Sequence, residues 1–424
     1  MTTKSSDNSL FKNYSFISLF TVQFLSALNS NAVKTTLLFY LTYISSEDGN
    51  LLISISTAFF ILPFFLFSAL AGQVADKFNK AYVLRGIKLY GLIIVILFST
   101  CFYLQQSYLL TLVIFMVGIE SAFVGPIKYS LLPEIVPDEK LLPANSLVES
   151  LTFLAILVGT LFGSVFLGNV YGNYIIIITL ISIASIAFIT SFFVSTDCDG
   201  DREIKVMINI FASTFSLAKY CYNHKKSWNL IILISWFWAL GIVILTEIVP
   251  YVKYSVHGKE SVATLFLILF SIGISIGTYS CTKLVKKFKS DKVVFYSGIL
   301  ISVALMLLSI SSYLQIQSTK EVSLLALVFD VRSWLIIFSF LLIAIFSGIY
   351  TIPLYTALQH TKDKSYLSRI ISVNNIMNAL FMVLGTGFIF VINLLEIDFV
   401  YMFLIMAVFN LVFIILNKKK IVLS

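Results

Sequence analysis

Charge is scarce in this chain. Only 12% of its 424 residues are Asp, Glu, Lys or Arg, whereas a soluble globular protein has about 25%. In turn, 59% are apolar, and the mean hydropathy is +0.97. This composition excludes a soluble enzyme, a disordered chain and a coiled coil. The net charge of +8 does not indicate nucleic-acid binding, because the basic residues are spread over loops between apolar runs. What remains is a polytopic membrane protein.

Residues that bind metals or form disulfides are also few. The three histidines, His224, His257 and His360, fall in expected loops without metal-binding neighbours, and the four cysteines show no CxxC spacing. No Walker A loop, nucleophile elbow or HExxH motif is present. We therefore expect no metal, no cofactor, no catalytic residue and no enzymatic activity.

Long apolar runs are what the sequence has in abundance. A transmembrane helix needs about 20 apolar residues, and the first run has no small-residue cleavage site, so it is interpreted as a span and not a signal peptide. Twelve such runs can be placed, at 15–42, 51–75, 82–104, 108–129, 143–168, 173–195, 227–251, 260–283, 292–314, 333–358, 368–393 and 398–417.

A long polar stretch follows the sixth run. It divides the chain into an N-terminal six-helix half (1–195), a cytoplasmic linker (196–226) and a C-terminal six-helix half (227–424). The two halves also resemble each other, since Pro126 near the end of the fourth run has a counterpart in Pro353 of the tenth. Paired breaks of this kind are typical of transporters built from internal repeats.

The linker carries a helical apolar pattern. Apolar residues recur at i, i+3 and i+4 from Ile204 to Ala218, which predicts an amphipathic helix on the inner membrane surface. It serves either as a tether between the halves or as a docking site for a cytoplasmic partner. The opposite, polar side is expected to hold Lys205, Asn209, Ser213 and Ser216.

Basic residues set the orientation. If the N-terminus is cytoplasmic, 24 of the 29 Lys and Arg residues lie on the cytoplasmic side, four lie outside and Lys34 lies within a span. Cytoplasmic loops carry such an excess of Lys and Arg. Both termini are therefore predicted to be cytoplasmic.

The short loop between the second and third runs reads GQVADKFNK, from Gly72 to Lys80. Its G-x-x-x-D-K-x-x-K pattern resembles the signature loop of the major facilitator superfamily. Gly72 allows close helix packing, and Asp76 can accept hydrogen bonds from a helix N-terminus of the other half. Lys77 and Lys80 anchor the loop, with Lys77 expected to pair with an acid on or after the fourth span. These four residues form a predicted latch that holds one of two alternating states. Cys281 replaces the acid after the eighth run, so a second latch is expected to be weak or absent.

Further segments resemble bacterial lysophospholipid transporters over nearly the whole chain. They are 23–31 (QFLSALNSN), 125–129 (GPIKY), 144–163 (ANSLVESLTFLAILVGTLFG) and 353–359 (PLYTALQ). The resemblance implies an all-α major facilitator fold with twelve transmembrane helices, in two six-helix halves related by a pseudo-two-fold axis. It also implies a location in a bacterial inner membrane. Two positions depart from the family pattern, because an acid is Ser30 here and a basic residue is Leu245.

Polar residues inside the runs are candidates for a substrate cavity, because an unpaired charge in a bilayer costs at least about 2.5–3.5 kcal/mol. Glu120 lies near the middle of the fourth span, where it carries protons, pairs with a base or remains a structural acid. One face of the first span forms a polar stripe suited to a headgroup or phosphate. The stripe consists of Gln23, Ser26, Ser30 and Lys34, with Asn31 at its margin and Asn29 off it. Other cavity candidates are Lys128, Tyr355, Gln359, Asn374 and Asn378.

The fifth span carries a gating or interface face. Small residues on it allow close packing, and it is expected to meet the other half of the chain. Glu149 either gates the inner mouth or is an interface acid. The face consists of Asn145, Glu149, Gly159 and Gly163.

Three functions remain open from the sequence. The first is a monomeric transporter that moves lysophosphatidylethanolamine or a similar lipid to the cytoplasmic leaflet by alternating access, with any acyltransferase a separate cytoplasmic partner. The second is a proton-coupled transporter of a water-soluble metabolite or drug. The third is a scaffold or sensor that transports nothing.

Overall fold

The computed structural model describes residues 10–44, 49–166, 171–315, 322–360 and 364–423. Within these ranges the chain is helical and contains no β-strand. Among the described residues, twelve helices are long and apolar enough to cross a membrane, which confirms the twelve expected spans. They are α1 (Tyr14–Tyr43), α2 (Gly49–Lys77), α3 (Lys80–Tyr103), α4 (Ser107–Ile135), α5 (Leu141–Val165), α6 (Gly172–Ser191), α8 (Lys225–Tyr254), α9 (Glu260–Lys287), α10 (Ser290–Gln315), α12 (Val331–Gln359), α13 (Leu367–Leu394) and α14 (Phe399–Leu416).

Two further helices are too short to cross a membrane. They are α7 (Ile210–Asn223), which lies in the linker, and α11 (Leu324–Phe329), which precedes α12. The expected end of the fifth run, residue 168, lies outside the described residues.

The chain folds into two compact units. Unit 1 contains most of the first six spans, the linker, the end of α12 and the start of α13, while unit 2 contains a stretch of α5 and most of the last six spans. Unit 1 comprises Met1–Ala144, Ala155–Asn223 and Gln359–Ile376, and unit 2 comprises Asn145–Leu154, His224–Leu358 and Met377–Ser424.

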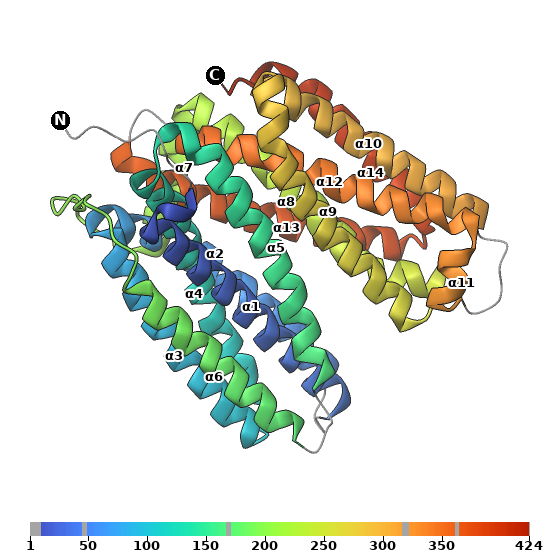
Figure 1. Cartoon of the computed structure of the whole chain (residues 1–424), viewed down its shortest axis with the longest axis horizontal. Helices are drawn as coiled ribbons and strands as arrows, with labels where there is room; N and C mark the ends of the chain where they lie inside the picture. Colours follow the sequence, from blue (N-terminus) through green and yellow to red (C-terminus); the bar gives the residue numbers. More distant parts are fainter. Residues whose placement is uncertain (1–9, 45–48, 167–170, 316–321, 361–363, 424) are drawn as a thin grey trace. The chain divides into compact units, whose positions relative to one another are not determined.

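Apolar side chains hold each unit together. In unit 1, α2 and α4 lie side by side, and α3 and α6 lie next to each other (Figure 1). The rings of Tyr40 and Phe102 meet edge to face there, with centroids 5.6 Å apart. In unit 2, α10 packs along α14 (Figure 1). Tyr251 contacts Phe403 with centroids 5.2 Å apart, and aromatic pairs of this geometry add to the free energy of apolar burial.

Prolines interrupt several of these helices, and two of the carbonyl groups they free are bonded by side chains. A helical proline cannot donate to the carbonyl four residues earlier. Pro133 thereby frees the carbonyl of Tyr129, which accepts a hydrogen bond from Gln359 Nε2 at 2.9 Å. Pro353 frees the carbonyl of Ile349, which lies 3.7 Å from Cys281 Sγ. Specific partners therefore fix both breaks in place.

Gly159 and Gly163 pack α5 against α1, which lies in the same half of the chain. A Cβ at Gly163 would lie 2.7 Å from the carbonyl oxygen of Ala32, and one at Gly159 would collide with the carbonyl oxygen of Leu28. The expectation that these glycines meet the other half is therefore wrong. The physical reason is that α1 and α5 approach so closely that only glycine fits between their backbones.

Gly159→Ala is expected to lower the free energy of unfolding by about 1–3 kcal/mol, because the added methyl group overpacks the contact with α1. Thermal unfolding of the purified protein would measure the change. Gly86→Ala is the matched control, since no atom lies within 4 Å of a Cβ at that position. An unchanged melting temperature for Gly159→Ala would contradict this packing.

The linker helix begins later than expected. Residues 204–209 are not helical, and α7 starts at Ile210. The side with Phe211 and Phe215 is exposed, as expected of an amphipathic helix on a membrane surface, whereas Ser213 on the polar side is buried against the protein. Ser213 is buried because it hydrogen-bonds Gln73 of α2. Local periodicity identified the helix but not the side of it that packs on the protein.

Candidate functional site

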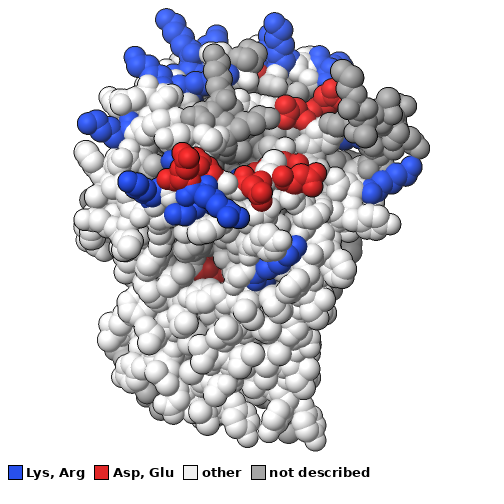
Figure 2. Space-filling model, turned by 90° about the vertical axis from the view of Figure 1, so that its left-hand side faces the viewer, with Lys and Arg blue, Asp and Glu red and all other residues white. Residues whose placement is uncertain are grey.

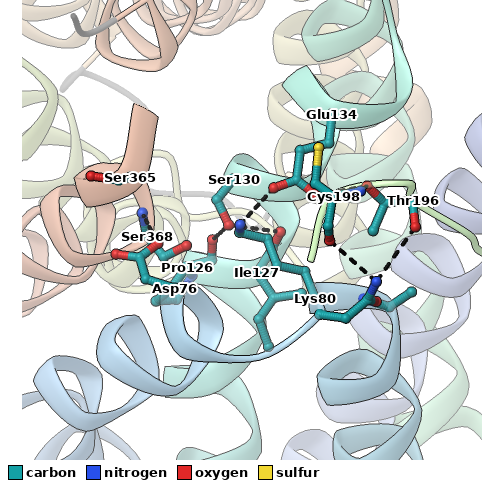
Figure 3. Close-up of polar contacts among 12 residues, drawn as sticks. Asp76, Lys80, Pro126, Ile127, Ser130, Glu134, Thr196, Cys198, Ser365 and Ser368 are labelled. Carbon is teal, nitrogen blue, oxygen red and sulfur yellow. Dashed lines mark hydrogen bonds and ion pairs between the residues drawn. The ribbon is translucent and has the colours of Figure 1, made fainter. Parts of the chain in front are cut away.

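The signature loop brings the end of α2 to the start of α13 inside unit 1. The Asp76 carboxylate accepts hydrogen bonds from the backbone nitrogens of Ser368 at 3.1 Å and Arg369 at 3.3 Å. Arg369 Nε also donates to it, at 2.8 Å. Figure 3 shows Asp76 beside Ser368. A helix N-terminus and a guanidinium both favour the ionised carboxylate, so Asp76 is held by a charge-assisted cluster.

Gly72 makes this approach possible. A Cβ at position 72 would lie 2.7 Å from Ser372 Oγ and 2.8 Å from the carbonyl oxygen of Ser368. Any larger residue would therefore push α13 away from α2 and lengthen the hydrogen bonds to Asp76. The loop pattern of the sequence thus has a direct steric meaning.

Glu134, the acid near the end of α4, pairs with Lys80. Lys80 Nζ lies 2.5 Å from Glu134 Oε1, and Thr196 Oγ1 donates to Glu134 Oε2 at 2.9 Å (Figure 3). Lys77, the residue expected to pair with such an acid, instead lies 5.8 Å from the ring centroid of its neighbour Phe78. The expected pairing of Lys77 is therefore wrong. Lys80 begins α3 and Glu134 lies in the last turn of α4, so the α3–α4 contact decides which lysine reaches the acid.

A second buried ion pair lies deeper in unit 1. Lys88 Nζ lies 2.7 Å from Glu120 Oε1 and donates to Ser26 Oγ at 2.8 Å. The Lys88 side chain is only 2% exposed and that of Glu120 is 13% exposed. Gly91, one turn after Lys88, leaves room for the carboxylate, because a Cβ there would lie 2.6 Å from Glu120 Oε1. The site is shaped to hold a carboxylate against α3.

Lys88 is the functional candidate that sequence reasoning missed, since it is one of the 24 Lys and Arg residues that the sequence assigns to the cytoplasmic side. A signal was present, because Lys88 lies inside an apolar run, as does Glu120 in the next run. Two opposite charges in neighbouring spans are expected to pair.

The polar stripe of α1 divides between two environments. Ser26, Asn29 and Ser30 line a small cavity with Lys88 and Glu120. The volume of this cavity that the centre of a water molecule can occupy is about 20 Å³. This is room for a single water molecule. It lies within unit 1, between helices of the N-terminal half.

The other stripe residues lie away from this cavity. Lys34 Nζ lies 4.3 Å from the ring centroid of Phe60, and Asn31 Nδ2 donates to the carbonyl of Ala27 on its own helix. Gln23 is buried, and its Nε2 has no hydrogen-bond partner among the described residues. Asn29, placed off the stripe, does face the cavity, and its Oδ1 likewise finds no partner among the residues that the structure describes.

Residues of the proline break in α4 lie against the start of α13. A Cβ at Gly125 would collide with Asn375 Nδ2, so glycine leaves room for that side chain. Lys128 is 9% exposed, with Nζ 4.2 Å from the ring centroid of Tyr129. Asn374, the residue before Asn375, is fully buried. Gln359 is held by the Tyr129 carbonyl described above.

Unit 2 gathers the remaining candidates. Asn145 Nδ2 donates to Thr356 Oγ1 at 3.1 Å, and Asn378 Oδ1 accepts from Ser235 Oγ at 2.9 Å. The hydroxyl of Tyr355 accepts from Trp238 Nε1 at 3.0 Å. Buried Glu149, 6% exposed, lines a small cavity together with Trp238 and Tyr355. The acid and two aromatic hydrogen-bonding groups are therefore within one pocket.

The counterpart of the signature loop in unit 2 packs closely against α12. A Cβ at Gly277 would collide with the carbonyl of Ile345, and Cys281 is buried against the carbonyl of Ile349. In the described ranges, no group of three His, Cys, Asp or Glu side chains is placed to hold a metal ion. On the face in Figure 2, basic and acidic side chains lie near one another, and much of the remaining surface carries neither.

Comparison with known proteins places the chain in a family. Residues 19–386 match the model of the Major Facilitator Superfamily. The lysophospholipid transporter LplT of Photorhabdus laumondii is 27% identical over 296 residues, which are 68% of this chain and 70% of that protein. The LplT of Citrobacter koseri is 28% identical over 306 residues, 69% of this chain and 72% of the relative. The aligned part is thus smaller than the motifs suggested.

Solved structures agree on the fold. The fucose:proton symporter FucP of Escherichia coli superimposes with a TM-score of 0.71 at 13% identity, covering 96% of this chain and 99% of FucP. The human organic anion transporter MFSD10 gives a TM-score of 0.73 at 10% identity, covering 96% and 99%. With the twelve spans and the signature loop, these matches show an all-α transporter fold, and the chain belongs to the major facilitator superfamily.

Proposed function

We propose that this protein moves a lysophospholipid, of the lysophosphatidylethanolamine type, from the outer to the cytoplasmic leaflet of a bacterial inner membrane. The observation that carries the proposal is the similarity to two relatives named lysophospholipid transporters, each over more than two thirds of both chains. A monomer with both termini in the cytoplasm is part of the proposal. A separate cytoplasmic acyltransferase would then reacylate the delivered lipid.

Alternating access supplies the mechanism. The two six-helix halves, 1–195 and 227–424, rock about a site near the middle of the membrane. The Asp76 cluster is a latch suited to this motion, because it joins α2 of one half to α13 of the other through contacts that can form and break. The proposed cavity residues that bind the polar headgroup are Lys128, Asn374 and Tyr355.

Transfer of labelled lysophosphatidylethanolamine tests the proposal. The purified protein is reconstituted in vesicles, the fluorescent lipid is added to the outer leaflet, and albumin extracts what has not crossed. Protein-dependent protection that persists with a protonophore is the expected result. Protection no greater than in protein-free vesicles would refute lipid transport.

A proton-coupled transporter of a water-soluble compound is the second candidate. Glu149 favours it, because this acid lies in a pocket with the hydrogen-bonding groups of Trp238 and Tyr355. The departures at Ser30 and Leu245 point the same way. Under this function a protonophore abolishes transport, and Glu149→Gln uncouples it.

Orientation can be tested with the native cysteines. Cys198 of the linker is exposed, whereas Cys221 is buried. Burial raises the pKa of Cys221 to about 12, so at neutral pH its thiol stays protonated and unreactive. In a Cys101→Ala background, a membrane-impermeant maleimide is expected to label inside-out vesicles only, and adding Cys198→Ser is expected to remove that label. Labelling of Cys198 in right-side-out vesicles would show that the orientation is the opposite of the proposed one.

A further inference from the structure

The linker is fastened to the signature loop through a buried glutamine. Gln73, 4% exposed, lies one residue after Gly72 on α2. Its Oε1 accepts from the backbone nitrogen of Met207 at 2.8 Å, and its Nε2 donates to Ser213 Oγ at 2.5 Å. One side chain of the loop therefore holds both the approach to α7 and the first turn of that helix.

Backbone contacts extend this attachment to the latch itself. The nitrogen of Asp201 donates to the carbonyl oxygen of Asp76 at 2.9 Å. Asn79 Nδ2 donates to the carbonyl of Cys198 at 3.2 Å. Gly200 lies so close to the backbone of Lys77 that a Cβ would not fit. The linker is thus a strap over the loop that positions Asp76.

The strap ends in a helix with an exposed aromatic face. Phe211 is 78% exposed, Phe215 73% and Tyr222 63%. These positions share one side of the helix. Ser213, on the opposite side, and Cys221, on one flank, are buried. The aromatic side of α7 therefore points away from the protein.

Chain connectivity and charge indicate what covers this face. The membrane-spanning helix α8 begins at Lys225, two residues after the end of α7, so that end of α7 is held at the membrane boundary. α7 has no acidic residue, and Lys219, Lys225 and Lys226 lie on it or directly after it. A helix with aromatic residues on one side and lysines beside them suits the headgroup region of an anionic leaflet.

We propose that α7 is a lipid-binding helix. Its Phe211–Phe215 face enters the headgroup region of an anionic leaflet, and its attachment to Gln73 makes the signature loop respond to that contact. The ligand is the lipid surface itself and not the transported substrate.

The contact with lipid can be measured without any transport assay. A fluorescent NBD group is attached to Phe211→Cys, Phe215→Cys or the control Ser216→Cys, which is exposed on the flank of the helix. The background carries Cys101→Ala and Cys198→Ser, so that the buried Cys221 and Cys281 remain as unlabelled thiols. The full-length protein is reconstituted in vesicles with and without phosphatidylglycerol.

We expect nitroxide-labelled lipid to quench the probe at positions 211 and 215, and iodide in the water to quench it at position 216. The lipid quenching should fall in purely phosphatidylcholine vesicles. Iodide quenching at 211 and 215 equal to that at 216 would overturn the proposal, because the face would then be open to water or to a soluble protein.

The link to the latch has its own test, which rests on the proposed transport function. Phe211→Ala/Phe215→Ala is expected to lose the gain in lysophosphatidylethanolamine transfer that anionic lipid gives the unmodified protein. Gln73→Leu should lose the same gain while the probe at 215 stays in lipid. Equal gains in all three proteins, or no gain in the unmodified one, would overturn the link. Absence of transfer in every vesicle would refute lysophospholipid transport and leave the quenching result standing.

Discussion

Lys88→Met is expected to lower the free energy of unfolding by about 3–5 kcal/mol, because it leaves Glu120 as a buried carboxylate without its partner. The pair is close, at 2.7 Å, and the Lys88 side chain is almost fully buried. Glu120→Gln should destabilise the protein in the same way by stranding the ammonium group. Equilibrium unfolding of the purified protein in mixed micelles would measure both changes.

The double variant distinguishes the effect of losing the whole ion pair on stability from the effect of leaving one buried charge unpaired. Lys88→Met/Glu120→Met leaves no charge in the cavity, and replacing a buried ion pair by apolar residues of similar volume is often neutral or stabilising. We therefore expect most of the lost stability to return. Thr100→Ala, on the same helix but exposed, is the control.

This result also decides a question about coupling. If Glu120 were a proton carrier, Glu120→Gln would abolish a response to the proton gradient without loss of stability. The ion pair with Lys88 leads us to expect a structural role for Glu120 instead. A stable Glu120→Gln protein that no longer responds to the gradient would contradict that role.

Asp76→Asn is expected to slow transport about tenfold or more without preventing membrane insertion. The carboxylate accepts two backbone hydrogen bonds and one from Arg369, and a hydrogen bond to a charged group contributes about 1.5–3 kcal/mol. Asparagine keeps an acceptor but loses the charge, so the state that the latch holds becomes too rarely populated. Initial rates of lysophosphatidylethanolamine transfer would measure the effect.

Two controls accompany this variant. Asp199→Asn removes an exposed acid of the linker and should transport normally. Arg369→Gln removes the guanidinium partner and should resemble Asp76→Asn. Normal rates for Asp76→Asn in correctly inserted protein would show that the cluster is not a latch.

The spans and the loop could be predicted from the sequence because each depends on local chemistry. An apolar run of about 20 residues is long enough to cross a bilayer as a helix, and all twelve expected spans are helices. The G-x-x-x-D pattern likewise places an acid one turn after a close helix contact. The close contact of Gly72 with α13 brings Asp76 to the start of that helix.

Partners across helices could not be predicted in this way. Lys77 and Lys80 are the same residue type in the same short motif. Only the packing of α3 on α4 brings Lys80 to Glu134. Lys88 looked like a cytoplasmic anchor until its helix was placed beside Glu120. Gly159 looked like a contact with the other half, yet α1 is its neighbour.

The sequence by itself determined that this is a membrane protein of twelve spans, with a linker after the sixth and the signature loop after the second. These features follow from hydropathy and from short motifs, which act over one or two helical turns. Tertiary structure alone decided which side of α7 packs on the protein, which base meets Glu120 and which side chains bond the carbonyls freed by Pro133 and Pro353. Those choices depend on contacts between residues far apart in the chain, and helical periodicity carries no information about which neighbour a face will meet.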